Sequence, residues 1–201
     1  VSAVLFDEPL TVIDPHLKWQ LRRKLKQIHH ELRLTLIYVT HDQVEALTFA
    51  DHVLVMTRGR AVQMGSAAEL FERPSHTFVG HFIGSPGMNF IVAQVKKDKV
   101  HVSGMVLDLP KDIKITDGEI KLGIRPEYMT FTDANAEGSL PMSVTQIQDV
   151  GTHVILSAST AGQSIKARMP VELATYAKGD TVWLKVLGEN TCIYKDEEIV
   201  A

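Results

Sequence analysis

Two adjacent carboxylates, Asp7 and Glu8, follow a short apolar run at residues 4–6 and precede a proline. An apolar run that ends at charged residues and a proline is typical of a buried β strand that stops at the edge of a sheet. Two carboxylates at such an edge can divide the work of phosphoryl transfer, because one can hold a divalent metal ion while the other activates a water molecule. His41 follows a second apolar run and is a candidate to contact the group under attack.

The segment between the acids and the histidine predicts the elements that position them. Asp14 followed by Pro15 is typical of a helix N-cap with proline at the first helical position. Within residues 16–33, apolar side chains recur on one helical face, namely Leu17, Leu21, Leu25, Ile28 and Leu32. Residues 34–39 are again apolar, so the segment is predicted to be strand, helix and parallel strand. The acids and the histidine are then expected at one edge of the sheet.

A second helix signal follows the candidate histidine directly. Asp42 and Glu45 have the spacing of a capping box, in which the N-cap side chain and an acid three residues later satisfy each other's backbone amides. This pattern predicts a short helix that continues through Ala50. Asp42 is therefore expected to have a structural role beside the candidate site.

Ordinary structural interpretations exist for the same residues. An Asp-Glu-Pro sequence after a strand can be a simple turn, and a single histidine can be a structural residue. The helix at residues 16–33 is rich in lysine and arginine, which suits a nucleic-acid interface or a solvated helix face. The solvated face is favoured because the apolar stripe is already used for packing. None of the nine histidines has the spacing of a zinc site.

Several motifs resemble those of one family, the ABC transporter ATPases. Residues 4–10, Val-Leu-Phe-Asp-Glu-Pro-Leu, resemble its Walker B strand, and residues 11–14 resemble its D-loop. Residues 38–42, Tyr-Val-Thr-His-Asp, resemble the segment with the switch histidine. Residues 82–90 resemble the junction found in importers of the sugar and glycerol-phosphate kind. Residues 122–127, Leu-Gly-Ile-Arg-Pro-Glu, resemble a marker of the regulatory domain of maltose-type importer ATPases, which is built of OB-like barrels.

The resemblance implies a role for each candidate residue. Asp7 would hold Mg²⁺ through water, and Glu8 would be the general base of ATP hydrolysis. His41 would contact the γ-phosphate of ATP. Asp14 would lie at the contact with a second copy of the subunit, where each nucleotide site is completed.

The fold class expected from these patterns is α/β followed by all-β. Residues 1–84 are predicted to be the carboxyl-terminal part of a P-loop ABC ATPase domain, with a parallel sheet and flanking helices. From residue 88 onward the helical period disappears, and short runs rich in β-branched residues alternate with Gly, Pro and Asp-Gly turns. Residues 85–201 are therefore predicted to form a β-barrel, OB-like regulatory domain of the TOBE type. A cluster of Gly, Ser and Pro between the two resembles a linker.

Length, charge and missing motifs bound the function. The 201 residues carry a formal charge of −3 and a single cysteine, Cys192. No apolar run approaches the roughly 18 residues of a membrane span. The sequence contains neither the glycine-rich P-loop that cradles phosphates nor the family's signature loop. It begins with valine and enters a core strand at once, so we expect the carboxyl portion of a longer protein, inactive as an ATPase by itself.

The function expected is that of the ATP-hydrolysing subunit of an ABC importer for a sugar, polyol or glycerol-phosphate-like solute. Its cofactors would be ATP and Mg²⁺. Its partners would be transmembrane permease subunits, a second copy of the subunit and, indirectly, a solute-binding protein, at the cytoplasmic face of the bacterial inner membrane. Nucleic acid is not expected, because aromatic residues are few and no basic stripe accompanies them. The alternative is a non-catalytic regulatory fragment whose β domain senses a solute or a partner protein.

Overall fold

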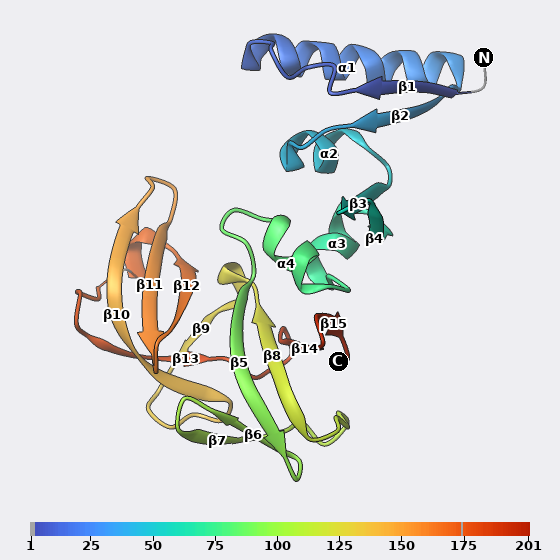
Figure 1. Cartoon of the computed structure of the whole chain (residues 1–201). Helices are drawn as coiled ribbons and strands as arrows, with labels where there is room; N and C mark the ends of the chain where they lie inside the picture. The colour runs from blue at the N-terminus through green and yellow to red at the C-terminus, as the bar shows by residue number, and fades with distance from the viewer. Residues whose placement is uncertain (1–2, 174) are drawn as a thin grey trace. The chain divides into compact units, whose positions relative to one another are not determined.

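The computed structural model describes residues 3–173 and 175–201 (Figure 1). The chain divides into two compact units, residues 1–70 and residues 71–201, which are described separately. No helix in the described ranges is both long enough and apolar enough to cross a membrane.

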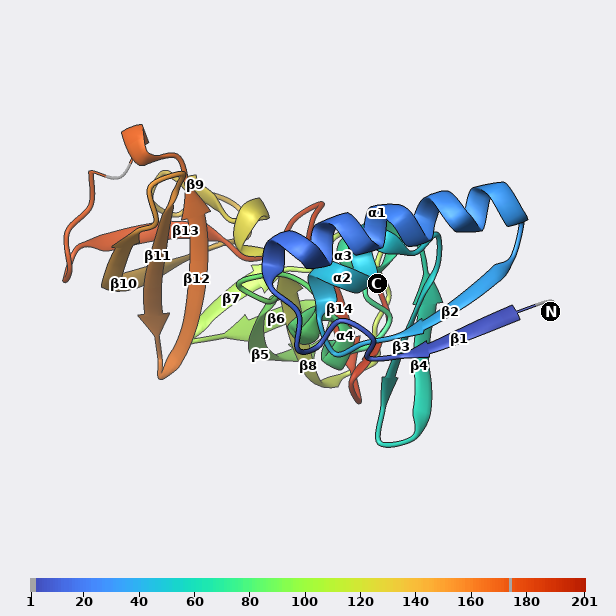
Figure 2. The same cartoon turned by 90° about the horizontal axis from the view of Figure 1, so that it is seen from above.

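The first unit begins with the strand, helix and strand predicted from the sequence. The elements are β1 (Ala3–Asp7), α1 (Pro15–Leu32) and β2 (Thr35–Val39). The two strands pair in parallel, with Asp7 opposite Val39, and α1 runs alongside them (Figure 2). The remaining elements of this unit are α2 (Gln43–Phe49), the antiparallel strands β3 (Val53–Thr57) and β4 (Arg60–Gly65), and α3 (Ala67–Glu72), which continues into the second unit.

The two parallel strands are less buried than their sequences predict. Phe6 and Tyr38 lie on one face, 6.4 Å apart between ring centroids, and are half-buried. Leu5 and Ile37 lie on the opposite face and are exposed. The prediction of a buried strand at residues 4–6 is therefore wrong for this structure, because one helix beside two strands covers a single face. Strands that are apolar on both faces suit a larger sheet that is covered on both sides.

The predicted apolar stripe of α1 is likewise only partly covered. No residue of α1 is buried, and Leu17 and Leu32 are exposed. The half-buried positions include Lys18 and Leu25, so the covered face is rotated relative to the stripe of leucines. The reason is the small number of elements that pack against the helix, together with an ion pair that draws Lys18 inward.

The second unit consists mainly of antiparallel strands, which confirms the all-β prediction for residues 85–201. A short helix, α4 (Thr77–Phe82), precedes the strands. The strands form a six-stranded sheet in the order β15-β14-β8-β5-β6-β7 and a five-stranded sheet in the order β12-β11-β10-β13-β9 (Figure 1). Their bounds are β5 (Asn89–Lys96), β6 (Lys99–Val102), β7 (Met105–Asp108), β8 (Gly118–Ile124), β9 (Thr130–Thr132), β10 (Ser139–Asp149), β11 (Val154–Thr160), β12 (Gln163–Met169), β13 (Thr181–Lys185), β14 (Cys192–Lys195) and β15 (Glu198–Ile199).

Two side-chain amides join the sheets of this unit into one core. Asn89, at the start of β5, donates to Lys166 O at 2.7 Å and accepts from Lys166 N at 2.8 Å. Gln163 of β12 makes the reciprocal pair of bonds with the backbone of Val92, at 2.6 and 3.1 Å. Most buried apolar side chains of both sheets form one cluster, and a smaller cluster contains Met88, Cys192 and Tyr194.

One buried side chain, Arg125, makes several of the contacts that pack residues 71–84 onto these strands. Arg125 is 1% exposed, and its guanidinium donates to the carbonyls of Phe71 and Gly80 at 3.0 and 2.9 Å and also to Ile83 O. The guanidinium carbon also lies 4.3 Å from the centroid of the Phe71 ring. The compact units consequently divide after residue 70, ahead of the predicted domain boundary between residues 84 and 85. Whether residues 85–201 act as a separate domain stays a prediction.

Candidate functional site

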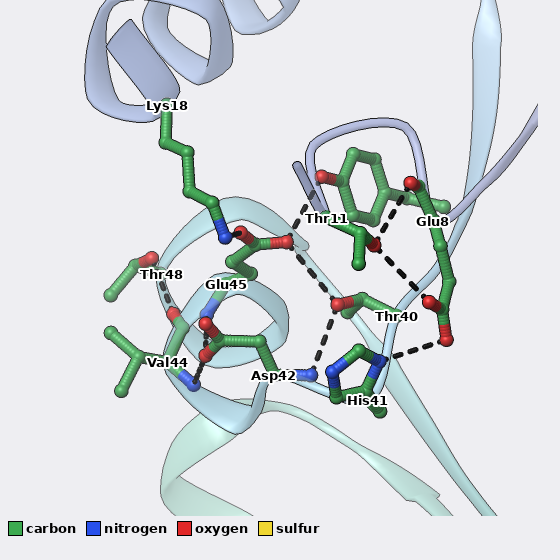
Figure 3. A network of polar contacts seen from close by, with 10 residues as sticks. Glu8, Thr11, Lys18, Thr40, His41, Asp42, Val44, Glu45 and Thr48 are labelled. Atoms are coloured by element: carbon green, nitrogen blue, oxygen red, sulfur yellow. Dashed lines mark hydrogen bonds and ion pairs between the residues drawn. The ribbon is translucent and has the colours of Figure 1, made fainter. Parts of the chain in front are cut away.

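The structure brings Glu8 and His41 together at the carboxyl ends of β1 and β2. His41 Nδ1 lies 2.8 Å from Glu8 Oε1 (Figure 3). The parallel pairing of the strands continues one step beyond β1, since Glu8 N donates to Val39 O at 2.9 Å. Two residues far apart in the sequence thus meet because both follow neighbouring parallel strands, as expected from the sequence pattern.

The backbone of Glu8 has an uncommon conformation. Its φ is +41°, in the left-handed region that residues other than glycine rarely adopt. The Thr11 hydroxyl lies 3.1 Å from both the backbone oxygen and Oε2 of Glu8, and Thr11 N lies 3.4 Å from Glu8 O. Backbone strain of this kind persists where surrounding contacts hold it, and it is concentrated at functional sites. Here the turn aims the Glu8 carboxylate across the strand ends toward His41.

The hydrogen bond between Glu8 and His41 changes the protonation of both. The bond from His41, followed by that from Thr11, lowers the pKa of the Glu8 carboxyl below its ordinary value. The bond to Glu8, and then the charge of Glu8, raise the pKa of the His41 imidazole. The Glu8 side chain is 42% exposed and the His41 side chain is 71% exposed, so solvent screens their attraction. The favoured state is an ionised carboxylate paired with an imidazolium.

The other two candidate acids stand apart from this pair. Asp7 is exposed at the end of β1, and within the described ranges its carboxylate has no hydrogen bond or ion pair. Asp14 Oδ1 accepts from His16 N at 2.9 Å, which confirms the predicted N-cap of α1. No cluster of three metal-ligating side chains occurs in the part of the chain that the structure describes. A single free carboxylate fits Mg²⁺, which keeps several waters and takes most other ligands from a bound phosphate group.

Sequence reasoning missed the role of Glu45. Asp42 caps α2 as predicted, since its Oδ1 accepts from the amides of Val44 and Glu45 at 2.9 and 3.1 Å. The predicted return bond from Glu45 to Asp42 N is wrong, because that amide donates to Thr40 Oγ1 instead. The Glu45 carboxylate turns inward and is 3% exposed (Figure 3). The spacing of a capping box is a local signal, and it does not distinguish an acid that folds back from one that is buried.

Among its described residues, the second unit has open surface hollows. One open hollow at the β5–β6 turn is lined by Lys96, Lys97, Lys99 and His101. Lys99 is already paired with Asp108 of β7, and Asp117 accepts from Lys97 N. This hollow therefore does not identify a ligand for the β strands.

Comparisons with known proteins agree over nearly the whole chain. The MalK OB fold domain matches residues 84–129, and the TOBE domain matches residues 122–192. The sn-glycerol-3-phosphate import ATP-binding protein UgpC of Vibrio vulnificus strain CMCP6 is 32% identical over 96% of this chain and 53% of its own length. UgpC of Escherichia coli K12 is 38% identical over 94% of this chain and 53% of its own length.

Other similarities are more limited in what they add. An uncharacterized ABC transporter ATP-binding protein, y4oS of Sinorhizobium fredii, is 36% identical over 90% of this chain and 48% of its own length. Among solved structures, the cytoplasmic molybdate-binding protein ModG with molybdate bound is similar at a TM-score of 0.41 and 12% identity. That similarity covers 52% of this chain and 94% of ModG. The chain spans about half the length of the curated relatives it matches.

Proposed function

Because this chain belongs to the family of ABC importer ATP-binding proteins of the sugar and glycerol-phosphate type, we propose that it is part of a subunit that hydrolyses ATP to drive import. Residues 1–84 would be the carboxyl-terminal part of the ATPase domain, and residues 85–201 would be the regulatory domain. The observation that carries the proposal is the contact of Glu8 with His41 at the ends of two parallel strands.

Glu8 is suited to act as the general base. Its lowered pKa keeps the carboxylate ionised at neutral pH, which is the state that accepts a proton from water. Its exposure leaves one face open to an attacking water molecule. The turn at Glu8 and the bond from His41 fix the direction of the carboxylate before substrate arrives, which removes part of the entropic cost of reaching the reactive geometry.

His41 is suited to contact the γ-phosphate of ATP, the group under attack. Nδ1 faces Glu8, so Nε2 remains free to donate to a phosphate oxygen, and the raised pKa favours the charged imidazolium that such a contact needs. Asp7 would hold Mg²⁺ through water at the neighbouring strand end. ATP would supply the phosphoryl group, and Mg²⁺ would neutralise part of its charge.

The proposed partners follow from the same family. The subunit would bind transmembrane permease subunits at the cytoplasmic face of the bacterial inner membrane, as a peripheral protein. A second copy would meet it near Asp14, and a solute-binding protein would act indirectly through the permease. The names of the relatives, which are import ATP-binding proteins, support this assignment.

The proposal is tested with the protein encoded by the complete reading frame that contains this sequence. We expect that frame to encode a P-loop upstream of residue 1 and its product to hydrolyse ATP. Glu8→Gln keeps the size and polarity of the side chain but removes the base, so ATP should still bind while hydrolysis falls by about 10² to 10⁴. His41→Ala should also abolish turnover.

Glu31→Gln is the matched control, because it removes one exposed carboxylate of α1 without touching the site. Near-normal hydrolysis by Glu8→Gln and His41→Ala, measured per folded protein, would contradict the assignment. A reading frame without a P-loop would favour the alternative, a non-catalytic fragment whose β domain senses a solute or a partner protein. The 201-residue chain alone is expected to show no significant ATPase activity.

A further inference from the structure

A buried carboxylate lies behind the loop that carries His41. Glu45 Oε2 accepts from the Tyr38 hydroxyl at 3.1 Å and from Thr40 Oγ1 at 3.2 Å. Glu45 Oε1 lies 3.2 Å from Lys18 Nζ, as an ion pair rather than a well-directed hydrogen bond. A buried charge is costly unless it is paired and hydrogen-bonded, so these contacts hold the carboxylate and its partners in one arrangement.

Thr40 transmits this arrangement to the histidine loop. A hydroxyl has one proton to donate and two lone pairs with which to accept. Thr40 Oγ1 donates to Glu45 and accepts from Asp42 N at 3.0 Å. The residues on both sides of His41 are thereby fixed. Glu45 holds Thr40, and Asp42 is held both by Thr40 and by its own capping of α2.

The same carboxylate also connects the loops that follow the two parallel strands. Lys18 lies in the first turn of α1, and its amide donates to Asp14 O at 2.9 Å. Glu45 therefore joins the start of α1, which follows the loop after β1, to the loop after β2 (Figure 3). These are the loops that carry Glu8 and His41.

We propose that Glu45, acting through Thr40, is a positioning residue that holds His41 against Glu8. This inference rests on the proposed function for its catalytic meaning, but its geometric content stands on the contacts of the first unit alone. Glu45 touches neither Glu8 nor His41, so its effect on any reaction is indirect. The competing interpretation makes Glu45 a structural acid whose removal lowers stability without altering the orientation of His41.

The first test uses the ring nitrogens of His41 in the 201-residue chain, observed by NMR at neutral pH and assigned with a His41→Gln variant. Glu8→Gln gives the reference spectrum for a weakened contact. Thr40→Val removes the hydroxyl without changing charge, so we expect the Nδ1 resonance of His41 to move toward that reference. Thr40→Ser restores the hydroxyl and should restore the wild-type position.

Glu45 itself is tested by Glu45→Gln and Glu45→Ala, each of which removes the ion pair with Lys18. Both should shift the His41 resonance in the same direction as Thr40→Val. Glu31→Gln controls for the lost charge. Glu69→Gln controls for lost stability, because Glu69 closes a capping box with Ser66 elsewhere in this unit, at 2.7 to 3.3 Å. Wild-type His41 resonances in Thr40→Val and both Glu45 variants would overturn the proposal.

The activity test separates this inference from the proposed function. In the complete protein, Thr40→Val should lower kcat on the order of 10-fold with little change in the KM for ATP, because misplacement of a reacting group by about 1 Å can cost up to 10² in rate. Thr40→Ser should rescue kcat. If the His41 resonances shift but Glu8→Gln still hydrolyses ATP normally, the proposed function fails and the positioning role stands. If Glu8→Gln is inactive while the resonances do not shift, the reverse holds.

Discussion

At the scale of single residues, the Glu8–His41 contact couples two titrations. The pKa of His41 is raised, so the stabilisation of the fold by its imidazolium is fully present below the ordinary pKa of histidine. This stabilisation is lost as the pH rises through the raised pKa. The pKa of Glu8 is lowered, so the stabilisation of the fold by its carboxylate is fully present above the ordinary pKa of glutamate. This stabilisation is lost as the pH falls through the lowered pKa. The stabilisation by the ion pair is therefore complete between the ordinary pKa of glutamate and the ordinary pKa of histidine, and it declines outside that window.

This coupling predicts the titration of His41 in the 201-residue chain. His41 should titrate above the ordinary value for histidine, and Glu8→Gln should bring its pKa down toward that value. The change is measured from the pH dependence of the His41 imidazole resonances by NMR. His30, an exposed histidine of α1, serves as the internal control, because its resonances at a fixed pH should be the same in both proteins. An unchanged His41 pKa in Glu8→Gln would show that the hydrogen bond does not persist in solution.

The residues of the candidate site were predictable to different degrees. Glu8, His41 and the cap at Asp14 follow from rules that need only neighbouring residues and strand ends. The partner of Glu45 could not be predicted, because an acid at the third position of a helix satisfies the same local rule whether it folds back or is buried. Only the arrangement of β2, α1 and α2 in space decides between these outcomes.

At the scale of elements, side-chain amides substitute for backbone pairing between β5 and β12. A primary amide presents one donor and one acceptor side by side, as a peptide group does, so Asn89 and Gln163 each satisfy both groups of one residue on the opposite strand. Asn89 is buried, whereas Gln163 is half-buried and its bonds with Val92 are exposed. The seam between the sheets therefore depends more on Asn89.

Substitution at this seam should destabilise the second unit unequally. Asn89→Ala removes both hydrogen-bond partners of the Lys166 backbone, which lie at the buried position 89, and should lower the free energy of unfolding by about 2 kcal/mol. Gln163→Ala should cost about 1 kcal/mol or less, because water replaces the lost bonds. The control is Gln148→Ala, at an exposed position on β10. Urea unfolding measures all three, and equal midpoints for Asn89→Ala and Gln148→Ala would contradict this account of the seam.

Helices and strands were predicted correctly where the hydrophobic pattern of the sequence reflects contacts made within this chain. Buried residues of β5 alternate with half-buried or exposed ones, as a strand on a core that is covered on one face requires. The apolar stripe of α1 and the outer face of β1 and β2 report instead on surfaces that this structure leaves exposed. Hydrophobic patterning predicts which faces are suited to burial, and it does not say which element covers them.

At the scale of the whole molecule, residues 71–84 are joined to the strands of the second unit through several independent contacts. Besides Arg125, the Tyr194 hydroxyl donates to Pro74 O at 2.8 Å. Thr77 N donates to Glu197 O at 2.9 Å, and the Thr77 hydroxyl donates to the Glu197 carboxylate. These contacts involve residues well separated in sequence from this segment. No local sequence signal announces them, which is why the division after residue 70 was not predicted.

The last prediction compares two polypeptides, residues 71–201 and residues 88–201. Both should unfold cooperatively, because the buried cluster of the strands begins at Ile91 and is retained in both. The shorter one should be less stable by about 3 kcal/mol, since it lacks the carbonyls of Phe71, Gly80 and Ile83 that accept from the Arg125 guanidinium. The variant Arg125→Met tests whether the Arg125 contacts cause this difference in stability. It should destabilise residues 71–201, where the carbonyls lose their donor. It should leave the stability of residues 88–201 unchanged or higher. Equal losses in both polypeptides, measured by urea unfolding, would mean that Arg125 acts through its own packing on the strands rather than by holding residues 71–84.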